Sequence, residues 1–146
     1  MKEKVLFICV HNSARSQMAE AFLNKIAAEK FMAESAGIEP GALNPVVVEV
    51  MKEVGIDISH HKSKSVDDLM KQGKIYDYVI TVCDEASAEK CPVFPGKAKK
   101  IHMGFPDPSG FTENYKKKLI KTREVRDQIK QKIESWVEEM NEYGTN

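Results

Sequence analysis

The chain has 146 residues, of which 42% are hydrophobic and 30% are charged, and its 22 basic and 22 acidic side chains give a formal net charge of zero. This length fits one globular domain with a buried core, and the balanced charge argues against a nucleic-acid or anionic-membrane surface. No apolar run is long enough to span a membrane or to act as a signal peptide. We therefore expect a cytoplasmic protein whose residues 1–146 form a single domain, with a frayed tail at 141–146.

Strands and helices are predicted to alternate along the chain. In order, the apolar patterns predict a strand at 5–9, a helix at 16–30, a strand at 32–37, a helix at 45–54, a short helix at 65–73, strands at 76–83 and 99–103, and a helix at 115–140. Asn44 is the predicted cap of the second helix, and Gly55 its stop. Such alternation implies parallel pairing, so we expect an α/β, flavodoxin-like fold with a four-stranded parallel sheet and helices on both faces.

The turn after the first predicted strand carries the strongest chemical signal. Cys9 ends the strand, five residues separate it from Arg15, and Ser16 opens the helix. Such a turn points successive backbone N–H groups into one concavity at a helix N-terminus, which suits a tetrahedral oxyanion. The amides, the helix dipole and the guanidinium favour a thiolate, although a cysteine at the end of an apolar strand can also be simple core. The predicted nucleophile is Cys9, and the predicted oxyanion-binding residues are Val10, His11, Asn12, Ser13, Ala14, Arg15 and Ser16.

Two further groups are predicted at the same edge of the sheet. Cys83 ends the strand at 76–83 and Asp107 follows the strand at 99–103, and ligands bind at the carboxyl ends of parallel strands. Asp107 can be a general acid, or it can simply accept hydrogen bonds from downstream amides in an Asp-Pro-Ser-Gly turn. With Cys91, the chain has three cysteines, an odd number that indicates reactive or metal-binding thiols before a disulfide framework.

Taken together, these segments resemble the low-molecular-weight protein tyrosine phosphatase superfamily, and within it the thioredoxin-coupled arsenate reductases. The likeness extends from about residue 5 to residue 137. It implies a four-stranded parallel sheet, which the alternation of elements indicates independently. The segments that carry the resemblance are 9–16 near the N-terminus, Asp107-Pro108, 15–20, 34–38, and Cys83 with Cys91.

The resemblance implies a first step on bound arsenate. Cys9 would attack arsenate that is held by the loop amides and by Arg15, while Asp107 would protonate the departing oxygen. Ser16 would hydrogen-bond the Cys9 thiolate. The implied partners are arsenate or phosphate and thioredoxin, with no nucleic acid, no membrane and no resident cofactor, in a monomer.

The resemblance also implies a relay of three thiols. Cys83 would attack Cys9, releasing arsenite and leaving a Cys9–Cys83 disulfide, and Cys91 would then convert it to a Cys83–Cys91 disulfide. Thioredoxin would reduce that disulfide, although glutaredoxin with glutathione is the other candidate donor. If residues 84–91 form a helix, an offset of eight residues is about 12 Å, whereas a disulfide needs Cα atoms within roughly 7 Å. Oxidation should therefore unwind this segment.

Some relatives bind a potassium ion beside the loop, and Asn12, Glu20 and Ser35 match most of that site. Lys64 stands where the remaining acidic ligand would be. We hypothesise that the Lys64 ammonium takes the place of the cation, so that activity does not depend on potassium; the alternative is a solvated lysine. No other metal site is predicted. His11 would bear a modest strain if the loop required positive φ at this position.

Two other functions remain open. A tyrosine phosphatase or general phosphomonoesterase would need only Cys9, Arg15 and Asp107. However, the absence of aromatic residues at 37–45 and directly after Asp107-Pro108 favours a small inorganic oxyanion, with at most weak phosphatase activity. A metal or metalloid sensor could use the three thiols, but their spacing matches no zinc pattern. The lysines at 116–118 are interpreted as a solvated helix face.

Overall fold

Four parallel strands form one sheet in the order β2-β1-β3-β4, as the sequence predicted. The computed structural model describes residues 2–84, 94 and 96–143. The strands are β1 (Glu3–Cys9), β2 (Phe31–Gly37), β3 (Tyr78–Thr81) and β4 (Lys99–His102). The helices are α1 (Arg15–Ile26), α2 (Pro45–Lys52), α3 (Val66–Lys71) and α4 (Tyr115–Tyr143), and a 3-10 helix occupies Pro108–Gly110.

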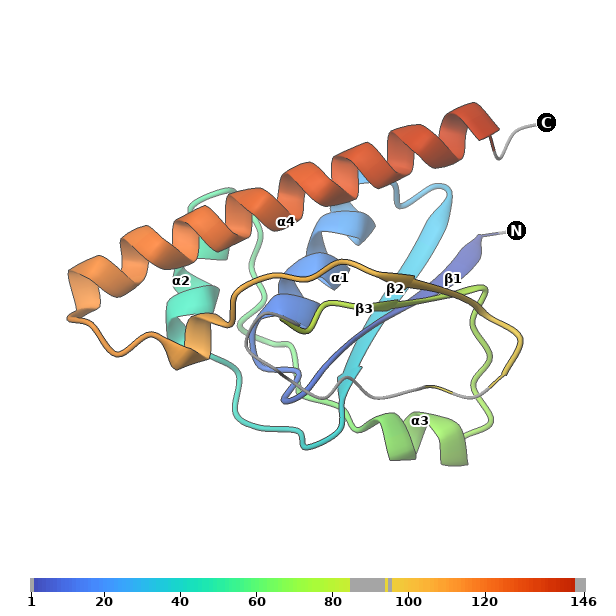
Figure 1. Ribbon diagram of the computed structural model, residues 1–146, viewed down its shortest axis with the longest axis horizontal. Coiled ribbons are helices and arrows are strands. Elements are labelled where there is room, and N and C mark those ends of the chain that lie inside the picture. Colours follow the sequence, from blue (N-terminus) through green and yellow to red (C-terminus); the bar gives the residue numbers. More distant parts are fainter. Residues whose placement is uncertain (1, 85–93, 95, 144–146) are drawn as a thin grey trace.

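Helices cover both faces of the sheet (Figure 1). Val5 and Phe7 of β1 point into a large core that includes apolar side chains of α1, α2 and α4. Leu6 and Ile8, which alternate with them, point into a smaller core under α3. Because β1 lies at the centre of the sheet and is buried on both sides, its sequence is almost continuously apolar. The α/β, flavodoxin-like class predicted from the sequence is therefore confirmed.

Several elements differ from their predicted bounds. Helix α1 ends at Ile26, before the predicted Lys30, because Ala27 leaves the helical region with φ −138° and the chain turns there toward β2. The strand predicted at 76–83 is shorter in the structure, where β3 spans Tyr78–Thr81. Helix α4 continues to Tyr143, past the predicted end at 140, and residues 144–146 lie outside the described part.

The second helix begins at Pro45 as predicted, but it ends at Lys52, two residues before the predicted end at 54. The side chain of Asn44 accepts a hydrogen bond from the amide of Val46 at 2.9 Å, and Pro45 occupies the first helical turn. Gly55 takes φ +79° just beyond the helix, a conformation that costs glycine little. None of the helices in the described residues is both long and apolar enough to cross a membrane.

The carboxyl end of β2 lies against the turn that follows β1. A Cβ atom on Gly37 would lie 2.6 Å from the carbonyl oxygen of Val10 and 2.8 Å from the amide nitrogen of Asn12. Only glycine allows the two backbones to approach this closely without displacement. Strand β2 therefore supplies one wall for the loop at residues 9–16.

Candidate active site

The carbonyl groups of the loop at 9–16 point outward and are satisfied there. The oxygens of Val10, His11 and Ser13 accept hydrogen bonds of 2.9–3.0 Å from three amides of the segment 39–44. A trans peptide unit points its N–H away from its C=O, so outward carbonyls leave the loop amides facing the inside of the turn. The loop therefore forms a concavity lined with N–H donors at the start of α1, which suits an oxyanion.

Asn12 fixes the shape of this loop. It is fully buried and takes φ +53°, the only positive φ of a non-glycine residue in the described chain. Its Nδ2 donates to Ser16 Oγ at 2.7 Å, and its Oδ1 accepts from the amide of Lys64 at 2.8 Å and from Gln17 Nε2 at 3.1 Å. His11 therefore does not bear the backbone strain that was considered for it. The residue with positive φ is Asn12, and asparagine tolerates the left-handed region better than most residues.

Cys9 lies at the base of the concavity and is 2% exposed. Its Sγ lies 2.8 Å from Ser16 Oγ and accepts a hydrogen bond from the amide of Asn12 at 3.1 Å. Hydrogen bonds donated to sulfur stabilise the thiolate more than the thiol. The predicted nucleophile and its predicted hydrogen-bond donor Ser16 are therefore in contact.

Arg15 and Asp107 meet across the opening of the loop. Arg15 is 2% exposed, and its Nη1 donates to the carbonyl oxygen of Phe105 at 3.1 Å. Its Nη2 lies 3.5 Å from Asp107 Oδ2. The other Asp107 oxygen accepts from the amide of Ser109 at 3.0 Å and caps the 3-10 helix. Asp107 therefore forms the turn that its sequence suggests and also faces the Arg15 guanidinium.

Cys83 lies beside the strand that carries Cys9. The pairing of Ile8 with Thr81 continues through a hydrogen bond of 2.9 Å from the amide of Val82 to the Ile8 carbonyl, so the two strands end side by side. Cys9 and Cys83 are both buried and belong to the same hydrophobic core, on the α1 and α4 side of the sheet. Cys91 and most of the segment 84–91, which was predicted to unwind, lie outside the described residues.

The residues predicted for a cation site are gathered beside the loop, and Lys64 is among them. Ser35 Oγ donates to Glu20 Oε1 at 2.8 Å, and Lys64 Nζ lies 3.7 Å from the same oxygen. The backbone amide of Lys64 binds the Asn12 side chain, as described above. An ammonium group therefore sits beside the carboxylate that a cation would contact. In the part of the chain that the structure describes, no cluster of three or more His, Cys, Asp or Glu residues could hold a metal ion.

Two residues that the sequence analysis left aside support the loop from behind. Gln17 Nε2 donates to both the backbone and the side-chain oxygen of Asn12, at 3.1 Å each. Gln17 Oε1 lies 3.0 Å from His61 Nδ1, and Glu20 Oε2 lies 3.5 Å from the same nitrogen. Burial lowers the pKa of His61 below its usual value, although Glu20 opposes this shift. Gln17 directly follows Arg15-Ser16, and that position was the only available signal of its role.

Comparison with known proteins agrees with this geometry. A model of the family described as low molecular weight phosphotyrosine protein phosphatase matches residues 4–146. An arsenate reductase of Staphylococcus aureus (strain N315) is 44% identical over 136 residues, which are 92% of this chain and 96% of that protein. A solved arsenate reductase in the reduced state is 33% identical with a TM-score of 0.74, over 96% of this chain and 99% of that one. A thioredoxin-dependent arsenate reductase from Corynebacterium glutamicum is 29% identical with a TM-score of 0.67, over 96% of this chain and 62% of that one.

The amide-lined loop at the carboxyl edge of a four-stranded parallel sheet and the family match define the class of protein. The chain belongs to the low molecular weight phosphotyrosine protein phosphatase family. Within this family, the relatives described above are arsenate reductases, and the chain groups with them, as the segments at 15–20 and 34–38 predicted.

Proposed function

We propose that this protein reduces arsenate to arsenite with Cys9 as the nucleophile. The arsenate oxygens would accept hydrogen bonds from the inward amides of residues 10–16 and from the two ends of the Arg15 guanidinium. The Cys9 thiolate would form a sulfur–arsenic bond and displace one oxygen, which leaves as water with a proton from Asp107. The observation that carries the proposal is the position of Cys9 Sγ at the base of an N–H-lined concavity, 2.8 Å from Ser16 Oγ and accepting a hydrogen bond from the Asn12 amide.

The electrons would come from a second thiol. In our proposal, the Cys83 thiolate attacks the Cys9 sulfur, the sulfur–arsenic bond breaks, and its electron pair stays on arsenic, which leaves as arsenite. Cys91 then attacks Cys83, and the dithiol of thioredoxin reduces the Cys83–Cys91 disulfide. The shared core of Cys9 and Cys83 supports the first exchange. The thioredoxin dependence of the Corynebacterium relative supports the choice of donor over glutaredoxin with glutathione.

A phosphatase is the second candidate, because the family match and the trio Cys9, Arg15 and Asp107 suit phosphate esters equally well. No aromatic side chain lies at 37–45 or directly after Asp107-Pro108, where a wall for a phenyl ring is expected. We therefore expect only weak hydrolysis of aryl phosphates. A small unesterified oxyanion is the better substrate for this site.

An assay with two substrates separates the candidates. Wild type, Cys9→Ser and Cys83→Ser are each given arsenate with reduced thioredoxin and, separately, para-nitrophenyl phosphate. We expect Cys9→Ser to lose both activities, and Cys83→Ser to lose arsenite formation while keeping the ester hydrolysis of wild type. Rapid ester hydrolysis by a wild type that forms no arsenite would establish the phosphatase instead.

A further inference from the structure

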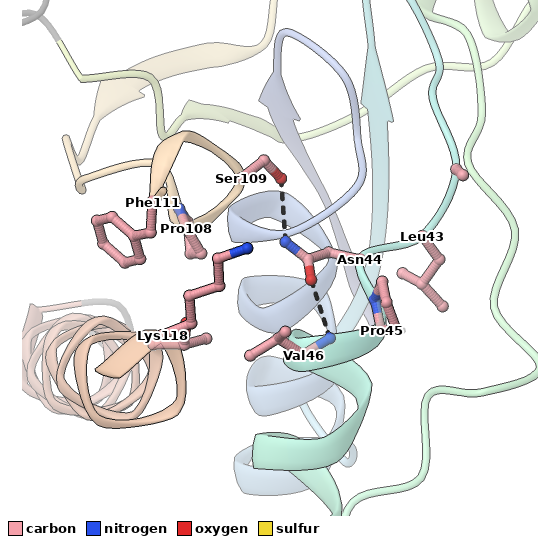
Figure 2. A pocket seen from close by; sticks show the side chains of 10 residues that line it. Leu43, Asn44, Pro45, Val46, Pro108, Ser109, Phe111 and Lys118 are labelled. Carbon is pink, nitrogen blue, oxygen red and sulfur yellow. Dashed lines mark hydrogen bonds between the residues drawn. The ribbon is translucent and has the colours of Figure 1, made fainter. Parts of the chain in front are cut away.

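A cavity of about 340 Å³ lies beside the active site and shares no lining residue with the loop at 9–16. It is enclosed by the start of α2, the 3-10 helix at Pro108–Gly110 and the first half of α4 (Figure 2). Its volume is at the small end of the range for cavities that hold small-molecule ligands. The residues that line it come from three separate segments of the chain, and the proposed chemistry of Cys9 uses none of them.

Lys118 brings a positive charge into this cavity. Figure 2 shows its ammonium group pointing toward the side chains of Asn44 and Ser109. Lys116 and Lys117 are exposed, as the sequence analysis expected of the whole lysine cluster, whereas Lys118 is half-buried. The Lys118 ammonium has no hydrogen-bond or ion-pair partner among the described residues, and none of the residues that line the cavity is acidic.

The other polar groups of the cavity are also donors. Asn44 Nδ2 donates to Ser109 Oγ at 3.1 Å, while the Asn44 oxygen is already used by the amide of Val46. One Asn44 N–H and the Ser109 hydroxyl proton are therefore left to donate. Thr122 is 1% exposed and lines the cavity, and its hydroxyl has no hydrogen-bond partner in the described chain. A cation and several donors thus converge on a space that no acidic side chain lines.

The remaining walls are apolar. Leu43, Val46 and Phe111 line the cavity together with two prolines. An inorganic anion would accept hydrogen bonds from the donors but would leave the apolar side chains exposed to water. An organic anion with an apolar body would satisfy the donors and the apolar walls together.

We propose that this cavity binds a small organic carboxylate. The carboxylate would lie between Lys118 Nζ, the Asn44 amide and the Thr122 hydroxyl, and the apolar body would lie against Phe111. A single ammonium matches a monoanion, which favours a carboxylate over a phosphate dianion. The site does not depend on the chemistry proposed for Cys9, so the two proposals can fail separately.

Benzoate is a suitable probe, and amide chemical shifts in two-dimensional NMR report where it binds. We expect saturable shifts at Val46, Phe111 and Thr122, and little change at residues 10–16. Lys118→Gln should weaken benzoate binding by at least about fivefold, because a charge-assisted hydrogen bond is lost. The matched control Lys117→Gln, at the exposed neighbour, should leave the Kd unchanged.

A second probe and a second variant check that benzoate binds in the cavity through the proposed contacts. Inorganic phosphate should change the amide chemical shifts of residues 10–16 and leave those of the cavity residues unchanged. Thr122→Val, which keeps the side-chain shape, should also weaken benzoate binding. The proposal is overturned by an absence of saturable benzoate shifts, by equal affinity in Lys118→Gln, or by benzoate shifts confined to the loop. It is also overturned if phosphate binds the cavity more tightly than benzoate. An unchanged pattern of amide shifts in each unliganded variant verifies that the fold is intact.

Discussion

Asn12 holds the loop at 9–16 together through both its backbone and its side chain. It turns the chain with φ +53° and links Ser16, which contacts Cys9, to the backbone of Lys64 on a separate loop. Asparagine can do both because it accepts the left-handed region and carries a donor and an acceptor on a short side chain. The sequence indicates that Asn12 lies in the loop but not that it makes the turn, because asparagine is common in loops whatever its φ.

Replacement of Asn12 should separate these two roles. We expect Asn12→Ala to lower the free energy of unfolding by about 3 kcal/mol, because it removes several buried hydrogen bonds and puts alanine in the left-handed region. Asn12→Gly removes the same side chain, but glycine adopts the positive φ of this position at little cost. This variant should therefore be about 1 kcal/mol more stable than Asn12→Ala. Urea denaturation followed by the fluorescence of Trp136, the single and buried tryptophan, measures both. Equal stability of the two variants would show that the turn carries no strain.

Lys64 should make activity independent of potassium. Its ammonium lies 3.7 Å from Glu20, and Ser35 donates to the same carboxylate oxygen. We expect wild-type arsenate reduction to proceed equally in potassium and sodium chloride. Lys64→Asp removes the ammonium and adds a carboxylate, so its activity should rise severalfold when potassium replaces sodium, whereas the control Lys62→Asp should show no such effect. A severalfold potassium activation of wild type would refute this role for Lys64.

At the scale of elements, the β2 end and the segment after it decide whether the loop can form. Gly37 contacts the backbone of Val10 and Asn12, and the amides of 39–44 bind the outward carbonyls of the loop. We expect Gly37→Ala to cost about 3 kcal/mol of stability or more, because its Cβ would meet rigid backbone at 2.6 Å. Gly110→Ala is the matched control, since a Cβ there meets nothing within 4 Å and the stability should change little. Thermal unfolding that gave equal losses for the two variants would contradict this assignment.

A cluster of Glu34, Tyr76 and Lys74 joins the middle of β2 to the segment before β3. Tyr76 Oη donates to Glu34 Oε2 at 2.5 Å, and Lys74 Nζ lies 3.0 Å from the other oxygen. Burial raises the pKa of Glu34, but the hydrogen bonds from Tyr76 and Lys74 together outweigh it and lower the pKa below its ordinary 4.5. Since the folded pKa is the lower one, the carboxylate stabilises the fold above pH 4.5, and this contribution is lost as the pH falls through the folded pKa.

The pH dependence of a neutral variant tests this cluster. Glu34→Gln should lower the free energy of unfolding by about 1 kcal/mol between pH 6 and 8. The difference from wild type should shrink when the pH falls below 4.5. Glu29→Gln, at an exposed residue in a turn, is the control and should not change stability at either pH. A difference for Glu34→Gln that stays constant down to pH 3 would argue against the assigned ionisation.

The order of elements was predictable because burial leaves a pattern in residue types. β1 is apolar on both faces, and Asn44 with Pro45 marks the start of α2. The support that residues 39–44 give to the loop at 9–16 was not predictable. It acts through backbone amides, which every residue except proline offers. The inward turn of Lys118 was hidden for a related reason: a lysine cluster on an amphipathic helix is usually solvated, and only the tertiary fold shows which lysine faces a cavity.

At the scale of the whole molecule, the parallel sheet brings chemistry from distant parts of the chain to one edge. The loop with Cys9 follows β1, Cys83 follows β3, and Asp107 follows β4, as expected for the carboxyl ends of parallel strands. The long helix α4 and helix α1 close the core that contains both described cysteines (Figure 1). The fold thus places the amide-lined loop with Cys9 and the sulfur of Cys83 on the same side of the sheet.

The central claim is that Cys83 attacks the Cys9 sulfur and so releases arsenite. It is tested most directly by mapping disulfides after one turnover. Cys91→Ser protein is reduced, freed of reductant, mixed with excess arsenate and then digested without further reduction for mass spectrometry. We predict one arsenite released per chain and an equal amount of the Cys9–Cys83 disulfide. Arsenite release with both thiols still reduced, or no arsenite from a chain that hydrolyses para-nitrophenyl phosphate, would contradict the relay.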